Sequence, residues 1–372
     1  MKKNSSLKKL ITFSFIMLIS SSLFAQFGQL GQILSTGKDD AEKILEAYIS
    51  PYANGMGAGL SAGWYNTAKS HKLGGFDVTF TLNAAIIPTS DKTYNPADLN
   101  LGDPGSGLTV DIGPGTSQTA AGKNQTGQQL NYYQDFEGNN IQIAQLNLPK
   151  GTGFAYTPVP MVQLGVGTVK ETDIIVRYSP ELDWGTGGKV GLWGVGVKHS
   201  IKQWIPALKR LPVLEMSLMG GYTKLTSTTG LNFQPSFYEG YADYIEEIPS
   251  YYDNQEMLLD VSNITANLLV SANLPIICIY GGVGISSSTA NLQLNGNYPF
   301  PEVDPTSGQV NVTQGSALSD PVDISIKNSD GSVTKPRLNA GFRLKLAVVT
   351  LHFDYTYANY SIATAGLGVT LR

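Results

Sequence analysis

Apolar and polar residues alternate along most of the chain, most regularly near its end. Over residues 337–346 and again over 349–357, every second residue is apolar, and mostly charged or polar residues stand between them. A period of two predicts β-strands with one apolar and one polar face. Runs of about ten residues exceed the five or six usual in soluble sheets. An apolar face opposite a charged face is typical of a transmembrane β-barrel, with lipid outside and a polar lumen inside.

Ten such strands can be counted from Phe76 onward, and their connections alternate between long and short. Bacterial barrels have short periplasmic turns and long external loops. The sequence therefore predicts an all-β fold: an antiparallel up-and-down transmembrane barrel of 10–14 strands. The long loops at 89–156, 226–256 and 295–335 are expected outside the cell, and both chain ends in the periplasm. A weak alternation at 129–147 leaves room for an extra hairpin.

One short connection, at 201–211, has a helical rather than a strand pattern. Apolar residues lie on one side of it and basic residues on the other. Such a segment fits an amphipathic element at the membrane–water interface. It fits a soluble cap on the barrel rim equally well, and the pattern does not separate the two.

The first 25 residues have the layout of a secretory signal, with four lysines, an apolar core and a cleavage site after Ala25. A retained membrane-anchor helix is the less favoured alternative, because the core is shorter than the roughly 20 residues a span needs. The expected division is a signal peptide at 1–25, an N-terminal helix and lumenal plug at 26–72, and an outer-membrane barrel at 73–372.

Within that second segment, residues 39–49 predict one amphipathic helix that ends before Pro51. A glycine-rich run follows. It is not expected to bind phosphate, because no strand precedes it and no βαβ unit surrounds it. Glycine more plausibly allows close backbone packing in a confined space. The candidate plug residues are Gly55, Gly57, Gly59, Trp64, Tyr65 and Asn66.

Composition limits the function. Loss of the signal would change the formal net charge from −4 to −8, which argues against nucleic acid as a partner. The single cysteine, Cys278, excludes an intrachain disulfide. The three histidines come with no metal-ligand spacing and no recognisable nucleophile motif, so neither an enzyme nor a cofactor or metal site is expected.

Charged residues at inward positions are the remaining candidates. They could pair across the lumen and only hold the barrel together, which we favour, or they could line a polar path or a gate. The candidate lumen-facing residues are Asp77, Asp173, Arg177, Glu215, Arg337, Arg343, His352 and Asp354.

Two resemblances add to this picture. The glycine-rich run with Trp64-Tyr-Asn-Thr-Ala, ahead of the Gly74-Gly-Phe-Asp-Val-Thr-Phe strand, resembles the N-terminal hatch of the long-chain fatty acid transporter (FadL-like) superfamily. Asn66-Thr-Ala stands here in place of the usual Asn-Pro-Ala. The whole chain, with its Lys198-His-Ser-Ile-Lys-Gln-Trp-Ile-Pro segment and its Gly366-Leu-Gly-Val-Thr-Leu-Arg end, resembles an uncharacterised family of Bacteroidetes outer-membrane proteins.

The hatch resemblance implies transport or permeation of a small hydrophobic compound, in the family's case a long-chain fatty acid, across the outer membrane. The alternative is a closed structural or partner-binding barrel whose loops dock surface or secretion-system components. Either protein would contact outer-membrane lipid and the barrel assembly machinery, and we expect a monomer. The chain ends in Arg372, so recognition for assembly is expected to depend on Leu367, Val369 and Leu371.

Overall fold

The computed structural model describes residues 33–371 except 35, 137, 184–187, 235–250, 301, 304–309, 312–316 and 327–333. The predicted secretory signal and most of the tyrosine-rich acidic loop lie outside the described residues.

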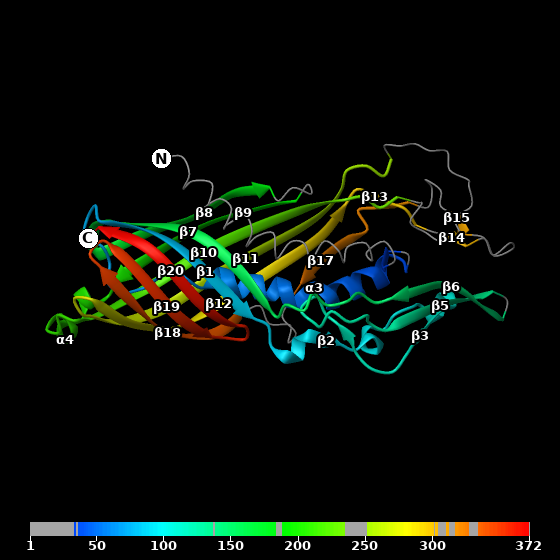
Figure 1. Cartoon of the computed structure of the whole chain (residues 1–372), viewed down its shortest axis with the longest axis horizontal. Coiled ribbons are helices and arrows are strands. Elements are labelled where there is room, and N and C mark those ends of the chain that lie inside the picture. Colours follow the sequence, from blue (N-terminus) through cyan, green and yellow to red (C-terminus); the bar gives the residue numbers. More distant parts are fainter. Residues whose placement is uncertain are drawn as a thin grey trace.

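Ten strands form a closed antiparallel barrel (Figure 1). Each strand pairs with the next, and the last closes on the first, with Phe76 opposite Leu371. The alternation of the sequence therefore predicted the architecture correctly, at the lower limit of 10–14 strands. The strands are β1 (Phe76–Ile86), β7 (Tyr156–Gly167), β8 (Thr172–Asp183), β9 (Lys189–Ser200), β10 (Leu214–Leu231), β11 (Gln255–Asn273), β12 (Ile277–Asn295), β18 (Thr334–Leu346), β19 (Val349–Tyr357) and β20 (Ser361–Leu371).

The outside of the barrel is an apolar belt. Along the strands, exposed apolar residues alternate with buried residues that face inward. This is the surface that a barrel embedded in lipid presents. None of the helices that the structure describes is long and apolar enough to cross a membrane. One outward residue of each strand illustrates the belt: Phe80, Leu164, Val176, Val195, Leu218, Ile264, Ile279, Phe342, Phe353 and Leu367.

The long connections build additional structure at one end of the barrel. β10, β11 and β12 extend beyond their neighbours, and β17 (Val322–Ile326) pairs with the outer end of β12. The hairpin expected at 129–147 forms, but it lies outside the barrel, in a three-stranded sheet of β3 (Leu108–Ile112), β5 (Gln129–Phe136) and β6 (Asn139–Asn147). Short two-stranded pairs are β2 (Thr93–Tyr94) with β4 (Ser117–Gln118), β13 (Asn297–Tyr298) with β16 (Leu318–Ser319), and β14 (Glu302–Val303) with β15 (Val310–Asn311).

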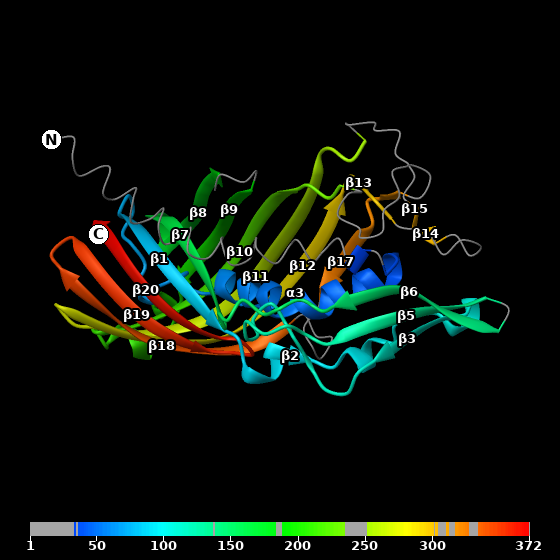
Figure 2. The same ribbon diagram turned by 45° about the vertical axis from the view of Figure 1, so that its right-hand side comes forward.

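A single long helix, α3 (Lys38–Ser61), runs into the barrel (Figure 2). The sequence predicted an end before Pro51, but the helix continues through Pro51 and the glycine-rich run. Proline and glycine weaken an isolated helix, so local propensity placed the boundary too early. Packing decides otherwise, because α3 lies against β1, β7, β10, β11, β12, β17 and β20.

The helix begins at the long-loop end of the barrel. Asp40 accepts a hydrogen bond from Gly102 N at 2.7 Å, and Lys43 donates to Asn100 O at 2.7 Å, both in the first long connection. The chain then crosses the lumen and reaches the short-turn rim, where Gly74 N donates to Gly167 O at 3.0 Å. The first barrel strand begins and the last barrel strand ends at this same rim, as an even number of strands predicts. The first described residues lie at the opposite, long-loop end.

The charged residues of the lumen lie nearer the short turns. Toward the long loops, most inward residues of the wall are apolar and pack on α3, although Thr157, Asn263 and Ser288 are polar. The outer half of the lumen is therefore more apolar than the polar strand faces of the sequence indicated. Apolar inward residues there include Val159, Leu192, Leu225, Leu259 and Leu292, and their partners on α3 include Ile44, Leu45, Ile49 and Leu60.

The ladder between β7 and β8 stops well short of the described ends of both strands. The outermost described pair joins Val162 to Tyr178. Beyond it, residues 156–161 of β7 pair with β1, and the outer part of β8 pairs with β9. Pro158, Pro160 and Pro180 stand in these stretches and lack the N–H that a ladder needs. We call this interruption the seam.

Candidate functional site

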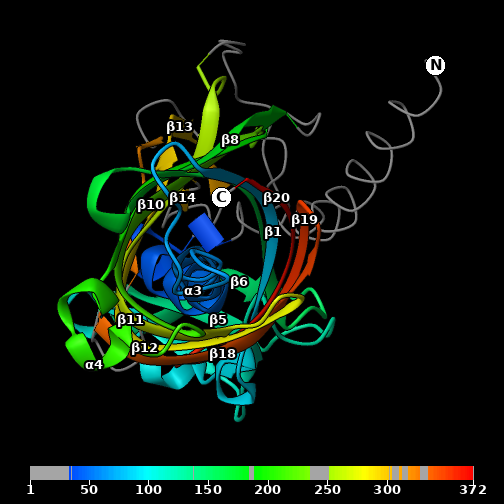
Figure 3. The same ribbon diagram turned by 90° about the vertical axis from the view of Figure 1, so that its left-hand side faces the viewer.

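The candidate site is built around the part of the chain that lies inside the barrel. We call it the plug segment, residues 38–72. It consists of α3 and the extended stretch that follows it. Viewed along the barrel axis, α3 lies inside the ring of strands (Figure 3). The wall contacts it at three levels: the end of the helix, the aromatic pair after it, and the exit at the short-turn rim.

Two buried arginines of the wall hold the C-terminal end of α3. Arg177 Nη1 donates to Leu60 O at 2.9 Å, and its Nη2 donates to Ala62 O at 2.7 Å. Arg337 Nη1 donates to Ser61 O. The last carbonyls of a helix lack partners within the helix and carry a partial negative charge. The last turn of α3 has no basic residue of its own, so the wall supplies the cations.

Trp64 lies directly below this helix end and is almost fully buried. The Arg177 guanidinium stacks over its ring, 3.5 Å from the centroid, a cation–π arrangement. The neighbouring strands β9 and β10 make room for the indole with two glycines that are paired with each other. A Cβ at Gly196 or at Gly221 would stand 2.6 Å from the nearest indole atom.

Tyr65 and Asn66 engage the opposite side of the lumen. The Tyr65 ring meets Tyr280 edge to face, with centroids 6.2 Å apart, and Gly282 leaves room for its hydroxyl. Asn66 Oδ1 accepts a hydrogen bond from Arg343 Nη1 at 2.8 Å. Neighbouring plug residues therefore fasten to different strands, which fixes the rotation of the plug about the barrel axis.

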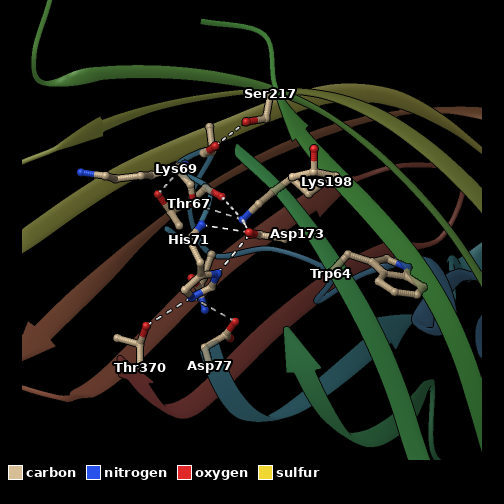
Figure 4. Close-up of polar contacts among 12 residues, drawn as sticks. Trp64, Thr67, Lys69, His71, Asp77, Asp173, Lys198, Ser217 and Thr370 are labelled. Atoms are coloured by element: carbon tan, nitrogen blue, oxygen red, sulfur yellow. Dashed lines mark hydrogen bonds and ion pairs between the residues drawn. The ribbon is translucent and has the colours of Figure 1, made fainter. Parts of the chain in front are cut away.

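A cluster of charged side chains holds the exit of the plug segment (Figure 4). We call it the lower cluster: His71, Asp77, Asp173 and Lys198. Asp173 Oδ1 accepts from His71 N at 2.9 Å, while its Oδ2 lies 3.1 Å from His71 Nδ1 and 3.0 Å from Lys198 Nζ. His71 Nε2 is 3.4 Å from Asp77 Oδ1. Lys198 also donates to Lys69 O at 3.2 Å.

Each buried charge of the lower cluster depends on an oppositely charged neighbour. Asp173 and Lys198 are buried, and a buried charge is tolerated only with partners. Removing one member of such a pair typically destabilises a protein by about 3–5 kcal/mol, because the other charge is left uncompensated. Three of the four residues belong to the wall strands β1, β8 and β9, and His71 belongs to the plug segment, so the wall and the plug segment stabilise each other here.

The plug glycines lie on the wall-facing side of α3. A Cβ at Gly55 would meet Thr157 Oγ1 at 2.4 Å, one at Gly57 would meet Ser288 at 2.7 Å, and one at Gly59 would meet Val159 at 2.6 Å. Gly55 and Gly59 therefore cover residues 157–159 of β7, the inner side of the seam. Glycine is required at these positions because the wall is too close to the helix backbone to leave room for a side chain.

The other candidate lumen residues also point inward. Glu215 pairs with Lys202 at 3.5 Å near the short-turn rim. Asp354 accepts from Tyr280 Oη at 2.8 Å and from Asn339 Nδ2 at 2.7 Å. His352 lies over Gly366, and no hydrogen bond joins it to Asp354 among the described residues. The two were expected to be neighbours, and they are, without forming a catalytic pair.

Several contact residues were not among the candidates. His71 precedes the first strand, so alternation gave no information about it. Gln163, which accepts from Arg177 Nε at 3.1 Å, and Asn83, which donates to Gly59 O at 2.8 Å, are uncharged inward residues. Both lie on predicted polar faces, which was the available signal. In the described parts of the chain, no group of three or more His, Cys, Asp or Glu residues could hold a metal ion.

Comparison with known proteins gives a family and distant structural likenesses. A family model described as "Family of unknown function (DUF6588)" matches residues 1–371. No curated protein matches the chain. Similar solved structures include Ail of Yersinia pestis in complex with the heparin analogue sucrose octasulfate, at 8% identity and a TM-score of 0.23, covering 80% of this chain and 98% of Ail.

Two further structures are similar at the same level. The translocator domain of the autotransporter NalP from Neisseria meningitidis has 9% identity and a TM-score of 0.26, with 81% of this chain and 89% of NalP covered. A deltaS2 mutant of the monoaromatic hydrocarbon channel TodX has 8% identity and a TM-score of 0.26, with 81% and 68% covered. Likenesses this weak do not bear on what the chain does.

Proposed function

Since the chain belongs to this family of unknown function, its geometry is the guide to its role, and we propose that it is an outer-membrane barrel that admits a small hydrophobic compound. The compound enters from the long-loop side and leaves through the seam into or across the membrane. The plug segment closes this path until it moves.

The observation that carries the proposal is the position of the seam. It lies in the more apolar half of the wall, where Gly55 and Gly59 of α3 cover it from inside. Val159 and Met161 face inward along it and are almost fully buried, and Val159 lies against Gly59 of the helix. Phe154 and Tyr156 stand at its outer end as an edge-to-face pair, with centroids 5.9 Å apart, and both are exposed.

The chemistry of the lumen favours a hydrophobic cargo with this exit. A compound that crossed the whole barrel would pass the arginines at the helix end and the lower cluster, which disfavour apolar groups. One that left through the seam would meet mainly apolar side chains. The seam then opens on the apolar belt, where lipid would receive the compound.

The location belongs to the same proposal. The apolar belt supports a membrane barrel, and the alternation of short and long connections supports an outer membrane with the long loops outside. The resemblance of residues 55–69 to the fatty-acid-transporter hatch adds support, because these residues lie inside the barrel. A long-chain fatty acid is therefore the first compound to test. The proposed protein is a monomer in contact with outer-membrane lipid.

A second function is favoured by one observation. The plug fills the lumen and is fastened at three levels, as in a barrel that never opens. In that case the long-loop end, with its additional sheets, would be the working part and would bind another component of the envelope.

The seam can be tested by closing it. Met161 and Ser179 occupy the next register position beyond Val162 and Tyr178, so Met161→Cys with Ser179→Cys puts one cysteine on each edge of the seam, and a disulfide formed between them would hold the seam closed. In liposomes with the purified protein, we expect saturable uptake of a long-chain fatty acid by the wild type. Oxidation of the double variant should reduce uptake severalfold, and reduction should restore it.

The matched control is Leu164→Cys with Val176→Cys, a pair that the ladder already joins. Its oxidation should leave uptake unchanged, and the native Cys278 is buried away from both sites. Deletion of residues 36–70 tests the plug separately and should alter uptake. No uptake by the wild type, together with no lipid retained in mass spectra, would sink the permeation proposal and leave the scaffold.

A further inference from the structure

The short-turn rim carries an apolar and basic surface that the permeation path does not use. The connection between β9 and β10, residues 201–213, projects from this rim. It contains η6 (Lys202–Trp204) and α4 (Pro206–Lys209) and forms no part of the barrel wall. We call it the rim element.

The rim element exposes large apolar side chains. Trp204 is 63% exposed and Leu211 is 49% exposed. Other short turns do the same at this end of the barrel: Leu73, Val169 and Ile276 are each at least 65% exposed. These residues continue the apolar belt past the last strand residues. In water, so many exposed apolar side chains on one rim would be unfavourable.

Trp204 is anchored on its polar side. Its Nε1 donates to His199 Nε2 at 3.1 Å, and His199 Nδ1 lies 2.8 Å from Thr172 Oγ1. The ring is therefore held at one edge while its face remains exposed. Tryptophans held in this way are typical of membrane–water interfaces, where one side is apolar and the other is polar.

The same rim is mainly basic, although the turn between β7 and β8 also exposes Glu171. Lys209 and Arg210 of the rim element are exposed, as are Lys72 and Lys170 of the neighbouring turns. None of these four takes part in the ion pairs recorded among the described residues. Lys202 is different, because it is bound to Glu215 and to Leu211 O. The opposite end is acidic: its described loops carry Asp91, Asp98, Asp103, Asp111, Asp253 and Asp320.

We propose that the rim element lies in the headgroup layer of the leaflet at the short-turn end and binds anionic phospholipid headgroups. Trp204 and Leu211 insert among the upper acyl chains, and Lys209 and Arg210 contact lipid phosphates. The charge of the surface selects an anionic partner, and its continuity with the apolar belt selects lipid over a soluble protein. This binding does not depend on permeation through the seam.

Quenching of Trp204 fluorescence by brominated lipids tests the proposal. The fluorescence of Trp204 is obtained by subtracting the signal of Trp204→Phe from that of the wild type. This subtraction removes the signals of the other tryptophans. Each vesicle preparation contains equal amounts of phosphatidylglycerol and phosphatidylcholine. In one preparation only the phosphatidylglycerol is brominated, and in the other only the phosphatidylcholine. Each basic residue near a surface enriches anionic lipid by on the order of fivefold. Trp204 should therefore be quenched at least about twofold more strongly by the anionic lipid.

Lys209→Gln with Arg210→Gln should make the two lipids equal. Lys123→Gln with Lys150→Gln, two exposed lysines at the long-loop end, should keep the preference. If the first variant does not fold, high salt applied to the wild type should remove the preference in the same way. The proposal is overturned if neither lipid quenches Trp204, as for a soluble or protein-bound cap, or if both quench it equally in the wild type.

Discussion

At the scale of single residues, the lumen is fitted by exchanging glycine with bulk. Where the plug presents Trp64 or Tyr65, the wall has Gly196, Gly221 or Gly282, and where the wall presents Val159, the plug has Gly59. A larger side chain on the plug or on the wall would therefore need a smaller one opposite it, because packed interiors have little free space.

Gly221→Ala tests this fit. The new Cβ would stand 2.6 Å from the Trp64 indole, which is held from its other face by Arg177. Overpacking of this kind typically destabilises a protein by about 1–3 kcal/mol. We expect a loss of that size in guanidinium unfolding of the protein in detergent micelles, together with a shift of the Trp64 emission.

Gly220→Ala is the control, since Gly220 is the preceding residue of the same strand and faces outward. The nearest atom to its new Cβ is 3.9 Å away. Both substitutions reduce backbone freedom alike, so the difference between them isolates the contact with Trp64. Equal stabilities for the two variants would show that Trp64 is not held against β10.

At the scale of elements, the sequence was informative about strands and misleading about the helix. A strand repeats every two residues and shows its lipid face directly, so ten strands and their parity could be read from alternation. The length of α3 could not, because Pro51 and the glycines after it are poor helix formers. They remain helical in contact with strands that are distant in sequence.

The seam and the contacts between plug and wall could not be predicted from the sequence for a related reason. Pro158, Pro160 and Pro180 were the signal for an interrupted ladder, but proline in a strand does not name the neighbour that it fails to pair with. Arg177 and Arg337 were predicted to face inward. Their role was not predictable, because they hold carbonyl groups of α3, which carry no sequence signature.

The contact of α3 with the first long connection should weaken at alkaline pH. Burial raises the pKa of Tyr48, and the nearby hydroxyls of Tyr52 and Tyr94 raise it further; burial also raises the pKa of Tyr94. A raised pKa in the folded state means that folding favours the protonated phenol. This contribution is complete below the ordinary value near 10 and falls by about 1.4 kcal/mol per pH unit and tyrosine above it.

We therefore expect segment 88–155 to become sensitive to protease above pH 10 while the barrel remains intact on gels. Tyr48→Phe with Tyr94→Phe removes both ionisable groups and should shift this loss of protection to higher pH. Tyr48 donates to Lys150 O at 2.9 Å, so the variant starts slightly less stable at neutral pH. An unchanged alkaline profile in the variant would assign the effect to other groups.

At the scale of the whole molecule, the barrel and the plug segment complete each other. The inward charges of the wall are balanced, with Asp77, Asp173, Glu215 and Asp354 against Arg177, Lys198, Arg337 and Arg343. The plug segment compensates the arginines with helix carbonyls and joins the lower cluster with His71. The plug segment therefore fills the lumen, which predicts a barrel that does not conduct ions.

Deletion of residues 36–70 should convert this closed barrel into a conducting one with weak ion selectivity, because four acidic and four basic side chains would then line the pore. Planar-bilayer recordings measure both properties. Asp173→Asn with Asp354→Asn in the deletion background leaves the lining basic and should make the pore prefer anions. A wild type that already conducts would mean that the plug does not seal the lumen. A deletion variant that folds but stays closed would mean that the wall collapses without its plug, which favours the scaffold function over permeation.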